Sequence, residues 1–180
     1  GDGRDGVRRH RELANERGIK IIVKTDAHRV VWGNATALEQ VVTNLLKNAI
    51  SYTPKGDGVV TVSVRPDYHG MVVLSVSDNG IGISQEDLFH IFEPFYRADT
   101  SRVRRIKKTG SGLGLTIVNE IVRVHHGRIN IQSALKKGTT VLVALPAGVR
   151  EDEEGENGEV GEHSELALDF TKGFTHATHR

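Results

Sequence analysis

The sequence predicts an α+β two-layer sandwich, in which helices cover one face of a mixed, mostly antiparallel sheet. Two long segments, near residues 34–53 and 113–124, place apolar residues at spacings of three and four. Pairs of short β-branched segments are separated by turn residues. The elements follow in the order helix, strands, helix, two strands, a long loop, helix, two strands, and this alternation of hairpins and long helices favours the sandwich.

The N-terminal third predicts a helix, two strands and a second helix. Residues 3–17 are rich in Arg, Glu and Ala and end before Gly18, which is typical of a short helix stopped by glycine. Residues 19–24 and 30–33 are β-branched and predict strands. Asn34 is placed to cap the next helix, which Pro54 and Gly56 end. Its apolar stripe consists of Leu38, Val41, Val42, Leu45, Leu46, Ala49 and Ile50.

The rest of the body predicts two strand pairs, a small helix and a long one. Residues 59–64 and 71–76 flank a turn at 66–70, and residues 128–133 and 139–145 flank a turn at 136–138. Ser84, with Asp87 three residues later, resembles a capping box and predicts a small helix. Residues 113–124 predict the second long helix, and Pro146 ends the ordered body.

The net charge of +1 is the sum of two oppositely charged parts. Residues 1–149 contain 21 basic and 14 acidic residues, a charge of +7, whereas residues 150–180 contain three basic and nine acidic residues, a charge of −6. The basic body is compatible with nucleic acid, nucleotide phosphates or an acidic protein as ligand. The tail, residues 149–180, is rich in Gly and Glu without periodicity and predicts disorder.

Cysteine is absent, which excludes disulfides, thiolate metal sites and a cysteine nucleophile. The longest apolar run is too short to span a bilayer, and the polar first residues do not resemble a signal peptide. These features predict a cytoplasmic location.

The first polar constellation lies on the helix after Asn34. Asn44 and Asn48 are four residues apart and share one helical face beside the apolar stripe. Asn is a mediocre helix former, so two on one face suggest a need for polar ligands, and amide oxygens suit Mg²⁺. A solvated helix face is the alternative interpretation.

The second constellation, residues 78–83, directly follows a strand. Asp78 stands at the strand end, and Gly80 and Gly82 allow a base or a backbone to approach closely. A simple Asp-Asn-Gly turn is the alternative, but a hairpin turn joins two strands and no strand follows here. The pattern therefore favours a functional role.

The third constellation, residues 110–115, opens the second long helix. Glycine N–H groups at a helix N-terminus form an anion site. The context excludes a dinucleotide fingerprint and a Walker loop, because neither a preceding strand nor Gly-Lys-Ser/Thr is present. Upstream lie aromatic residues and six bases, which predict either a small core under a solvated loop or a flexible cationic lid over polyphosphate. These residues are Phe89, Phe92, Phe95, Tyr96, Arg97, Arg102, Arg104, Arg105, Lys107 and Lys108.

In this order the motifs resemble the catalytic ATP-binding domain of sensor histidine kinases, in the gyrase–chaperone–kinase–MutL (GHKL, Bergerat fold) ATPase superfamily, over about residues 19–146. Residues 44–54 resemble the N box, 78–83 the first glycine box, 92–97 the F box and 110–115 the second glycine box. The resemblance implies residues 1–18 as a linker and the end of a dimerisation helix, residues 19–148 as the catalytic domain, and ATP and Mg²⁺ as cofactors.

The resemblance also implies roles for individual residues. Asp78 would accept a hydrogen bond from the adenine amine, Asn48 would hold Mg²⁺ with Asn44 beside it, and Tyr52 would lie along the adenine. Arg97 and Arg102 would contact phosphate, and Asn44, Arg97 and Arg102 are the residues assigned to catalysis. The other residues assigned to ATP are Gly80, Gly82, Ile83, Phe92, Tyr96, Lys107, Lys108, Gly110, Ser111, Gly112, Leu113, Gly114 and Thr139.

Two departures from the family pattern bear on the activity. Many sensor kinases carry a phosphate-binding Lys where this chain has Ser51, so a base between residues 97 and 108 would supply that charge. Hydrolytic members place a Glu general base where this chain has Asn44, which argues for transfer to a protein side chain and against efficient hydrolysis.

None of the nine histidines has the context of the family's phosphoacceptor. The chain is therefore expected to bind ATP but not to autophosphorylate alone. Its expected partners are a histidine-bearing dimerisation domain of the same kinase and a response regulator. The full-length kinase is expected to be a membrane-anchored homodimer, and this fragment a monomer.

Three other functions stay open at this stage. The first is an anti-sigma-type serine kinase, which shares the fold, although the F box and the basic lid are characteristic of sensor kinases. The second is a non-catalytic nucleotide-sensing module, because Ser51 replaces Lys. The third is a nucleic-acid binder, which is disfavoured because the bases concentrate in one loop without an aromatic strand on which bases could stack.

Overall fold

The computed structural model describes residues 3–25, 30–54, 56–67, 69–92, 114–148 and 167–169. Within these ranges the elements follow the predicted order. Their bounds are α1 (Gly3–Glu16), β1 (Lys20–Thr25), β2 (Val30–Trp32), α2 (Ala35–Tyr52), β3 (Val59–Pro66), β4 (Met71–Asp78), α3 (Gln85–His90), α5 (Gly114–Val124), β5 (Arg128–Ala134), β6 (Gly138–Pro146) and β7 (Ala167–Asp169).

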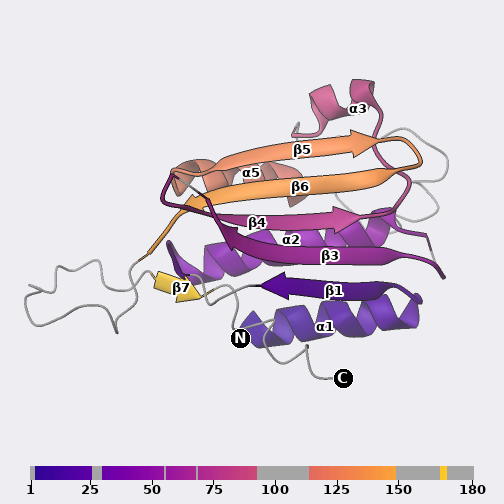
Figure 1. The fold of residues 1–180 in the computed structure, drawn as a ribbon, viewed down its shortest axis with the longest axis horizontal. Helices are drawn as coiled ribbons and strands as arrows, with labels where there is room; N and C mark the ends of the chain where they lie inside the picture. Colours follow the sequence, from indigo (N-terminus) through magenta and orange to yellow (C-terminus); the bar gives the residue numbers. More distant parts are fainter. Residues whose placement is uncertain are drawn as a thin grey trace, which may run out of the picture.

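A five-stranded sheet in the order β1-β3-β4-β6-β5 forms one layer. β1 and β3 pair in parallel, and the other neighbours pair antiparallel, so the sheet is mixed as predicted. The parallel pair requires a crossover connection, which runs through α2. α2 and α5 lie behind the sheet, with α1 beside β1 (Figure 1). The two-layer α+β prediction is therefore confirmed.

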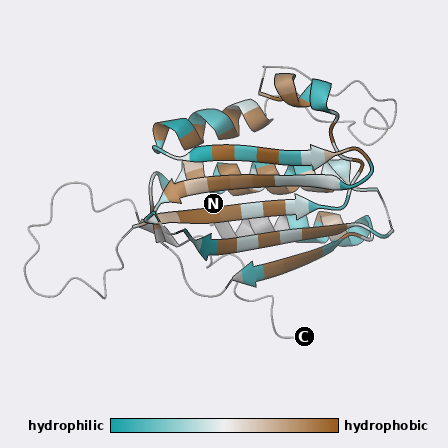
Figure 2. Ribbon diagram, turned by 45° about the horizontal axis from the view of Figure 1, so that its top comes forward, coloured by the Kyte–Doolittle hydropathy of each residue, from teal (hydrophilic) through white to brown (hydrophobic). Residues whose placement is uncertain are grey.

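The core lies between the sheet and these helices. Alternate residues of β3 and β4 are buried, because successive side chains of a strand point to opposite faces. The same alternation is visible as bands of hydropathy along the strands in Figure 2. Apart from Asp78 at the end of β4, the buried positions are apolar, and their partners from α2 and α5 include Leu38, Leu45 and Val118. Burial of these side chains supplies the main driving force for folding.

Local capping signals form as the sequence indicates. The Asn34 side chain accepts a hydrogen bond from the Ala37 N–H at 3.0 Å and caps α2. The Ser84 hydroxyl accepts from the Asp87 N–H at 3.1 Å and caps α3. The turn between β5 and β6 places Lys136 and Gly138 at φ 65° and 107°, a region that glycine adopts without strain.

The tail differs from the sequence-based expectation at three residues. Disorder was expected throughout residues 149–180, but Ala167–Asp169 forms β7, which pairs antiparallel with β2. In register, Leu168 lies opposite Val31. Leu166, Leu168 and Phe170 recur at every second position, but this alternation is short and lies in a segment whose Gly- and Glu-rich composition otherwise predicts disorder. The other residues of the tail lie outside the described part of the chain.

Candidate functional site at the end of the central strands

Asp78 is the last residue of β4, and its carboxylate is almost completely buried, with 8% of the residue exposed. Its Oδ1 accepts a hydrogen bond from the Gly80 N–H at 2.9 Å. Thr139, at the start of β6, lies directly opposite Asp78 in the ladder, and its backbone also hydrogen-bonds the carboxylate. The sheet therefore brings together two predicted site residues that are 61 positions apart in the sequence.

Burial changes the acid strength of this carboxyl. Desolvation raises the pKa of Asp78 from 3.8 to about 6, although the hydrogen bonds from Gly80 and Thr139 act in the opposite direction. A buried carboxylate with an unfavourable free energy of ionisation is typical of a functional site.

The loop after β4 is held between α2 and the turn that joins β5 to β6. A Cβ atom on Gly80 would lie 2.2 Å from the Tyr52 carbonyl oxygen, and one on Gly82 would lie 2.0 Å from the Ala134 carbonyl oxygen. The Ile81 N–H donates to the Tyr52 carbonyl at 3.1 Å. Both glycines are thus required by close backbone packing, which is the second of the two reasons that the sequence offered for them.

Ser133, which the sequence did not single out, ties the same loop to the sheet. Its hydroxyl accepts from the Ile83 N–H at 2.7 Å and lies 2.7 Å from the Thr139 hydroxyl. It also hydrogen-bonds the Gly138 carbonyl at 3.0 Å. An isolated serine in a strand carries no motif, so only the fold reveals that Ser133 fixes both Ile83 and Thr139.

α2 places a polar face beside the start of α5. Asn44, Asn48 and Tyr52 recur every four residues and so share one side of α2. A Cβ atom on Gly114, the first residue of α5, would lie 3.6 Å from the Asn48 Nδ2, so Asn48 lies against the end of the second glycine box. The Asn44 Nδ2 is buried and has no hydrogen-bond partner among the described residues. A buried amide without a partner is costly, which fits a site that a polar ligand completes.

Some of the remaining predicted site residues lie within the described part of the chain, and the others lie outside it. Phe92 is half-buried, and its carbonyl accepts from the Thr116 hydroxyl at 2.8 Å, which joins the F box to α5. Ser51, in place of the usual Lys, donates to the Lys47 carbonyl at 2.8 Å within α2. The predicted site residues that lie outside the described residues are Tyr96, Arg97, Arg102, Lys107, Lys108, Gly110, Ser111, Gly112 and Leu113.

A separate cavity of about 640 Å³ lies on the open face of the sheet. It is lined by residues around the turn between β3 and β4 and by the beginning of β5, including Arg65 and Arg128. No predicted site residue lines it. Among the described residues, no group of three or more His, Cys, Asp and Glu side chains could hold a metal ion.

The fold and this site define a class: an α+β nucleotide-binding domain with a buried aspartate at the end of a central strand. Residues 33–149 match the family described as histidine kinase-, DNA gyrase B- and HSP90-like ATPase. The chain belongs to this family.

Relatives with known names lie among sensor kinases. Sporulation kinase B of Bacillus subtilis is 35% identical over 134 residues, which cover 74% of this chain and 29% of the relative. The sensor-like histidine kinase SenX3 of Mycobacterium tuberculosis is 35% identical over 162 residues, which cover 90% of this chain and 38% of the relative. The chain thus spans roughly a third of the length of these relatives.

A solved structure described as mycobacterial sensor histidine kinase MprB is similar over the whole fold. Its TM-score is 0.67 at 30% identity, and the match covers 79% of this chain and 94% of that chain. This chain is accordingly an ATP-binding catalytic domain of the histidine kinase type. No helix of the described residues is long and apolar enough to cross a membrane.

Proposed function

We propose that this domain binds ATP at the end of β4 and provides the γ-phosphate for transfer to a histidine on a separate dimerisation domain of the same kinase. The observation that carries the proposal is the buried Asp78 carboxylate, held between the N–H groups of Gly80 and Thr139 within a chain of this ATPase family. Such a carboxylate retains lone pairs for a donor on the ligand.

The residues of the site have distinct proposed roles. Asp78 accepts a hydrogen bond from the exocyclic amine of adenine, which guanine does not offer at that position. Tyr52 and Ile83, which are both buried around the loop after β4, form the apolar side of the base site. Thr139 fixes the other side of Asp78 through the ladder and through Ser133.

Asn44 and Asn48 fit the phosphate end of the ligand. Their side chains share a face of α2 next to Gly114, and the Asn44 amide nitrogen is buried with no partner in the part of the chain that the structure describes. We propose that Asn48 holds Mg²⁺ and that Asn44 orients the same ligand. When bound, Mg²⁺ supplies charge neutralisation at the phosphates. Arg97, Arg102, Lys107 and Lys108 are proposed to add positive charge, which Ser51 does not provide.

Asn44 stands where hydrolytic members have a general base, so the domain holds no base there to activate water. Catalysis by this domain therefore consists of positioning and electrostatic stabilisation of the phosphates. The acceptor histidine belongs to the partner domain, and a response regulator and a membrane anchor belong to the proposed whole kinase.

Titration of ATP into the chain by calorimetry, with Mg²⁺ and with EDTA, tests the proposal. Saturable binding that strengthens with Mg²⁺, and that weakens in Asp78→Asn and loses its Mg²⁺ dependence in Asn48→Ala, is the expected result. If Asp78→Asn binds ATP as tightly as the unchanged chain, the adenine assignment is wrong. If Asn48→Ala keeps the full response to Mg²⁺, the metal assignment is wrong.

A further inference from the structure

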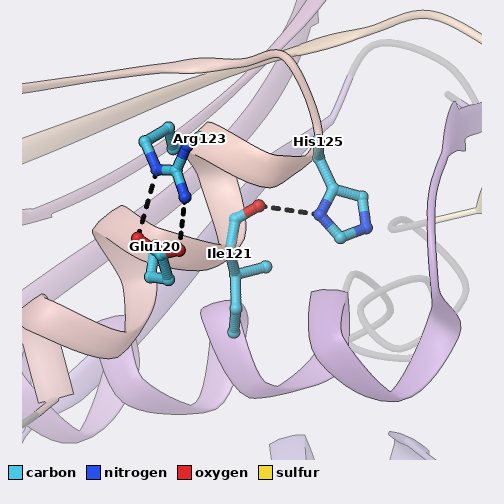
Figure 3. Close-up of polar contacts among 4 residues, drawn as sticks. All are labelled: Glu120, Ile121, Arg123 and His125. Carbon is cyan, nitrogen blue, oxygen red and sulfur yellow. Dashed lines mark hydrogen bonds and ion pairs between the residues drawn. The ribbon is translucent and has the colours of Figure 1, made fainter.

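His125 lies one residue beyond α5 and hydrogen-bonds to two different elements. Its Nδ1 lies 2.7 Å from the Ile121 carbonyl oxygen, one turn back on α5, as Figure 3 shows. Its Nε2 accepts a hydrogen bond from the Asn34 N–H at 3.0 Å, at the residue that caps α2. The imidazole therefore connects the C-terminal end of α5 to the N-terminal end of α2.

These two contacts fix the protonation state of the ring. A carbonyl oxygen only accepts, so Nδ1 must carry a proton and donate it to Ile121. The Asn34 N–H only donates, so Nε2 must be unprotonated. These two hydrogen bonds together form the His125 clasp. The clasp requires the neutral Nδ1–H tautomer, because a doubly protonated imidazolium cannot accept from the Asn34 N–H.

The surroundings of the ring leave it little freedom. A Cβ atom on Gly33 would lie 2.4 Å from the His125 Cδ2 and 2.6 Å from the Leu38 Cδ1, so the ring and Leu38 fill the space in front of Gly33. Leu38 is fully buried and belongs to the core. The ring is thus packed at the junction of β2 with α2.

α2 and α5 are antiparallel neighbours with contacts at both ends. His125 meets Asn34 at one end, and Gly114 meets Asn48 at the other. Eleven residues separate Gly114 from His125, or about 16 Å of helix at 1.5 Å per residue. If the contact between His125 and Asn34 is lost, α5 can rotate or slide against α2, and Gly114 then moves relative to Asn48.

We propose that His125 is a positioning residue of the nucleotide site, which clamps α5 to α2 and so sets the spacing between Asn48 and Gly114. The inference rests on the proposed ATP site, since those two residues belong to it. His125 itself lies at the opposite end of the helix pair and does not touch the ligand.

Among the described residues, the elements that meet at His125 carry a small set of other ionisable groups. On α5, Glu120 and Arg123 pair with each other (Figure 3), and His126 follows His125 in the sequence. β2 has no ionisable residue, and α2 contributes Glu39 in its second turn.

Four variants measured for ATP affinity and for urea stability test the proposal. Gln places an oxygen near the position of Nε2 and keeps the acceptor for Asn34, whereas Asn retains only a donor near the position of Nδ1. We expect His125→Ala and His125→Asn to raise the dissociation constant of ATP by about fivefold, the equivalent of one hydrogen bond, and His125→Gln to stay within about twofold. His69→Gln, on an exposed residue of the turn between β3 and β4, is the matched control.

Rescue by the conservative variant supplies a readout that a purely structural role would not change. His125→Gln keeps an acceptor for the Asn34 N–H, whereas His125→Asn does not, so we expect the two variants to differ in ATP affinity. The ratio of dissociation constants for the unchanged chain and His69→Gln should stay near one.

Three outcomes have separate meanings. If all four variants bind ATP as tightly as the unchanged chain, the positioning role is refuted. If His125→Ala changes only the urea midpoint, while the folded variant keeps its affinity, the residue is structural and the inference also fails. Titration of ATP into the unchanged chain separates the third outcome. If that chain does not bind ATP, the proposed function is wrong.

Discussion

Replacement of Asp78 by Asn should stabilise the domain while it weakens the binding of ATP. The pKa of the carboxyl is raised from 3.8 to about 6, so ionising it in the folded chain costs about 3 kcal/mol more than in the unfolded chain. Asn carries no charge and can still accept from the Gly80 N–H through its oxygen. It loses part of the interaction with Thr139, at a cost of about 1 kcal/mol. The net gain at pH 7.5 is therefore about 2 kcal/mol.

The direction in which this stability difference changes with pH follows from the two pKa values of Asp78, which are 3.8 in the unfolded chain and about 6 in the folded chain. Above pH 6 the carboxyl is ionised in both states, and the folded chain bears the full penalty. Between pH 6 and pH 3.8 the folded chain binds a proton more readily than the unfolded chain, so the penalty disappears as the pH falls. The advantage of Asp78→Asn over the unchanged chain must therefore shrink across this window.

Urea unfolding of both chains at pH 7.5, 6 and 4.5, together with ATP titration at pH 7.5, measures both effects. Asp57→Asn, at an exposed aspartate, is the control and should change neither quantity. We expect the affinity of Asp78→Asn for ATP to fall about tenfold or more, the equivalent of a hydrogen bond to a charged group. A variant that is less stable than the unchanged chain at pH 7.5, or whose advantage does not depend on pH, would refute the reasoning.

Three further predictions concern other residues. Gly138→Ala should destabilise the domain by more than about 3 kcal/mol, because its Cβ would lie 2.0 Å from the Asp78 carbonyl oxygen, whereas Gly56→Ala, at the same φ of 107° with nothing within 4 Å, should cost only about 1 kcal/mol; equal urea midpoints would contradict the contact argument. His126→Gly should raise the stability by about 1 kcal/mol without a change in ATP affinity, since His126 has a φ of 60° just beyond α5; a lower melting temperature would contradict it. Leu38→Ala should lower the unfolding free energy by about 3 kcal/mol, because the side chain is fully buried between the helices and the sheet; a loss below about 1 kcal/mol in denaturant unfolding would show that the site collapses around the missing volume.

The sequence predicted the helices and the strands of the main sheet because their signals are local. Asn34 and Ser84 act as caps through contacts within four residues, and β4 is indicated by its own run of apolar and β-branched residues. It also indicated Asp78 and Asn48 as candidates, since their motifs are short and ordered.

Other features depend on contacts that no local pattern records. The role of Ser133 arises from its nearness to Ile83, 50 positions away, and the clasp of His125 joins residues 91 positions apart. The reason for Gly82 likewise became clear only when Ala134 was placed against it. Contacts between residues far apart in the sequence depend on the fold as a whole, so no local sequence pattern predicts them.

Transfer of phosphate to histidine tests the central claim most directly. The chain is incubated with γ-labelled ATP, Mg²⁺ and the histidine-bearing dimerisation domain of its own kinase, and the label on that domain is measured before and after mild acid. We expect acid-labile label on the dimerisation domain, none on this chain alone, and loss of the label with Asp78→Asn. Acid-stable label on a serine-bearing substrate, or tight ATP binding without any transfer, would contradict it.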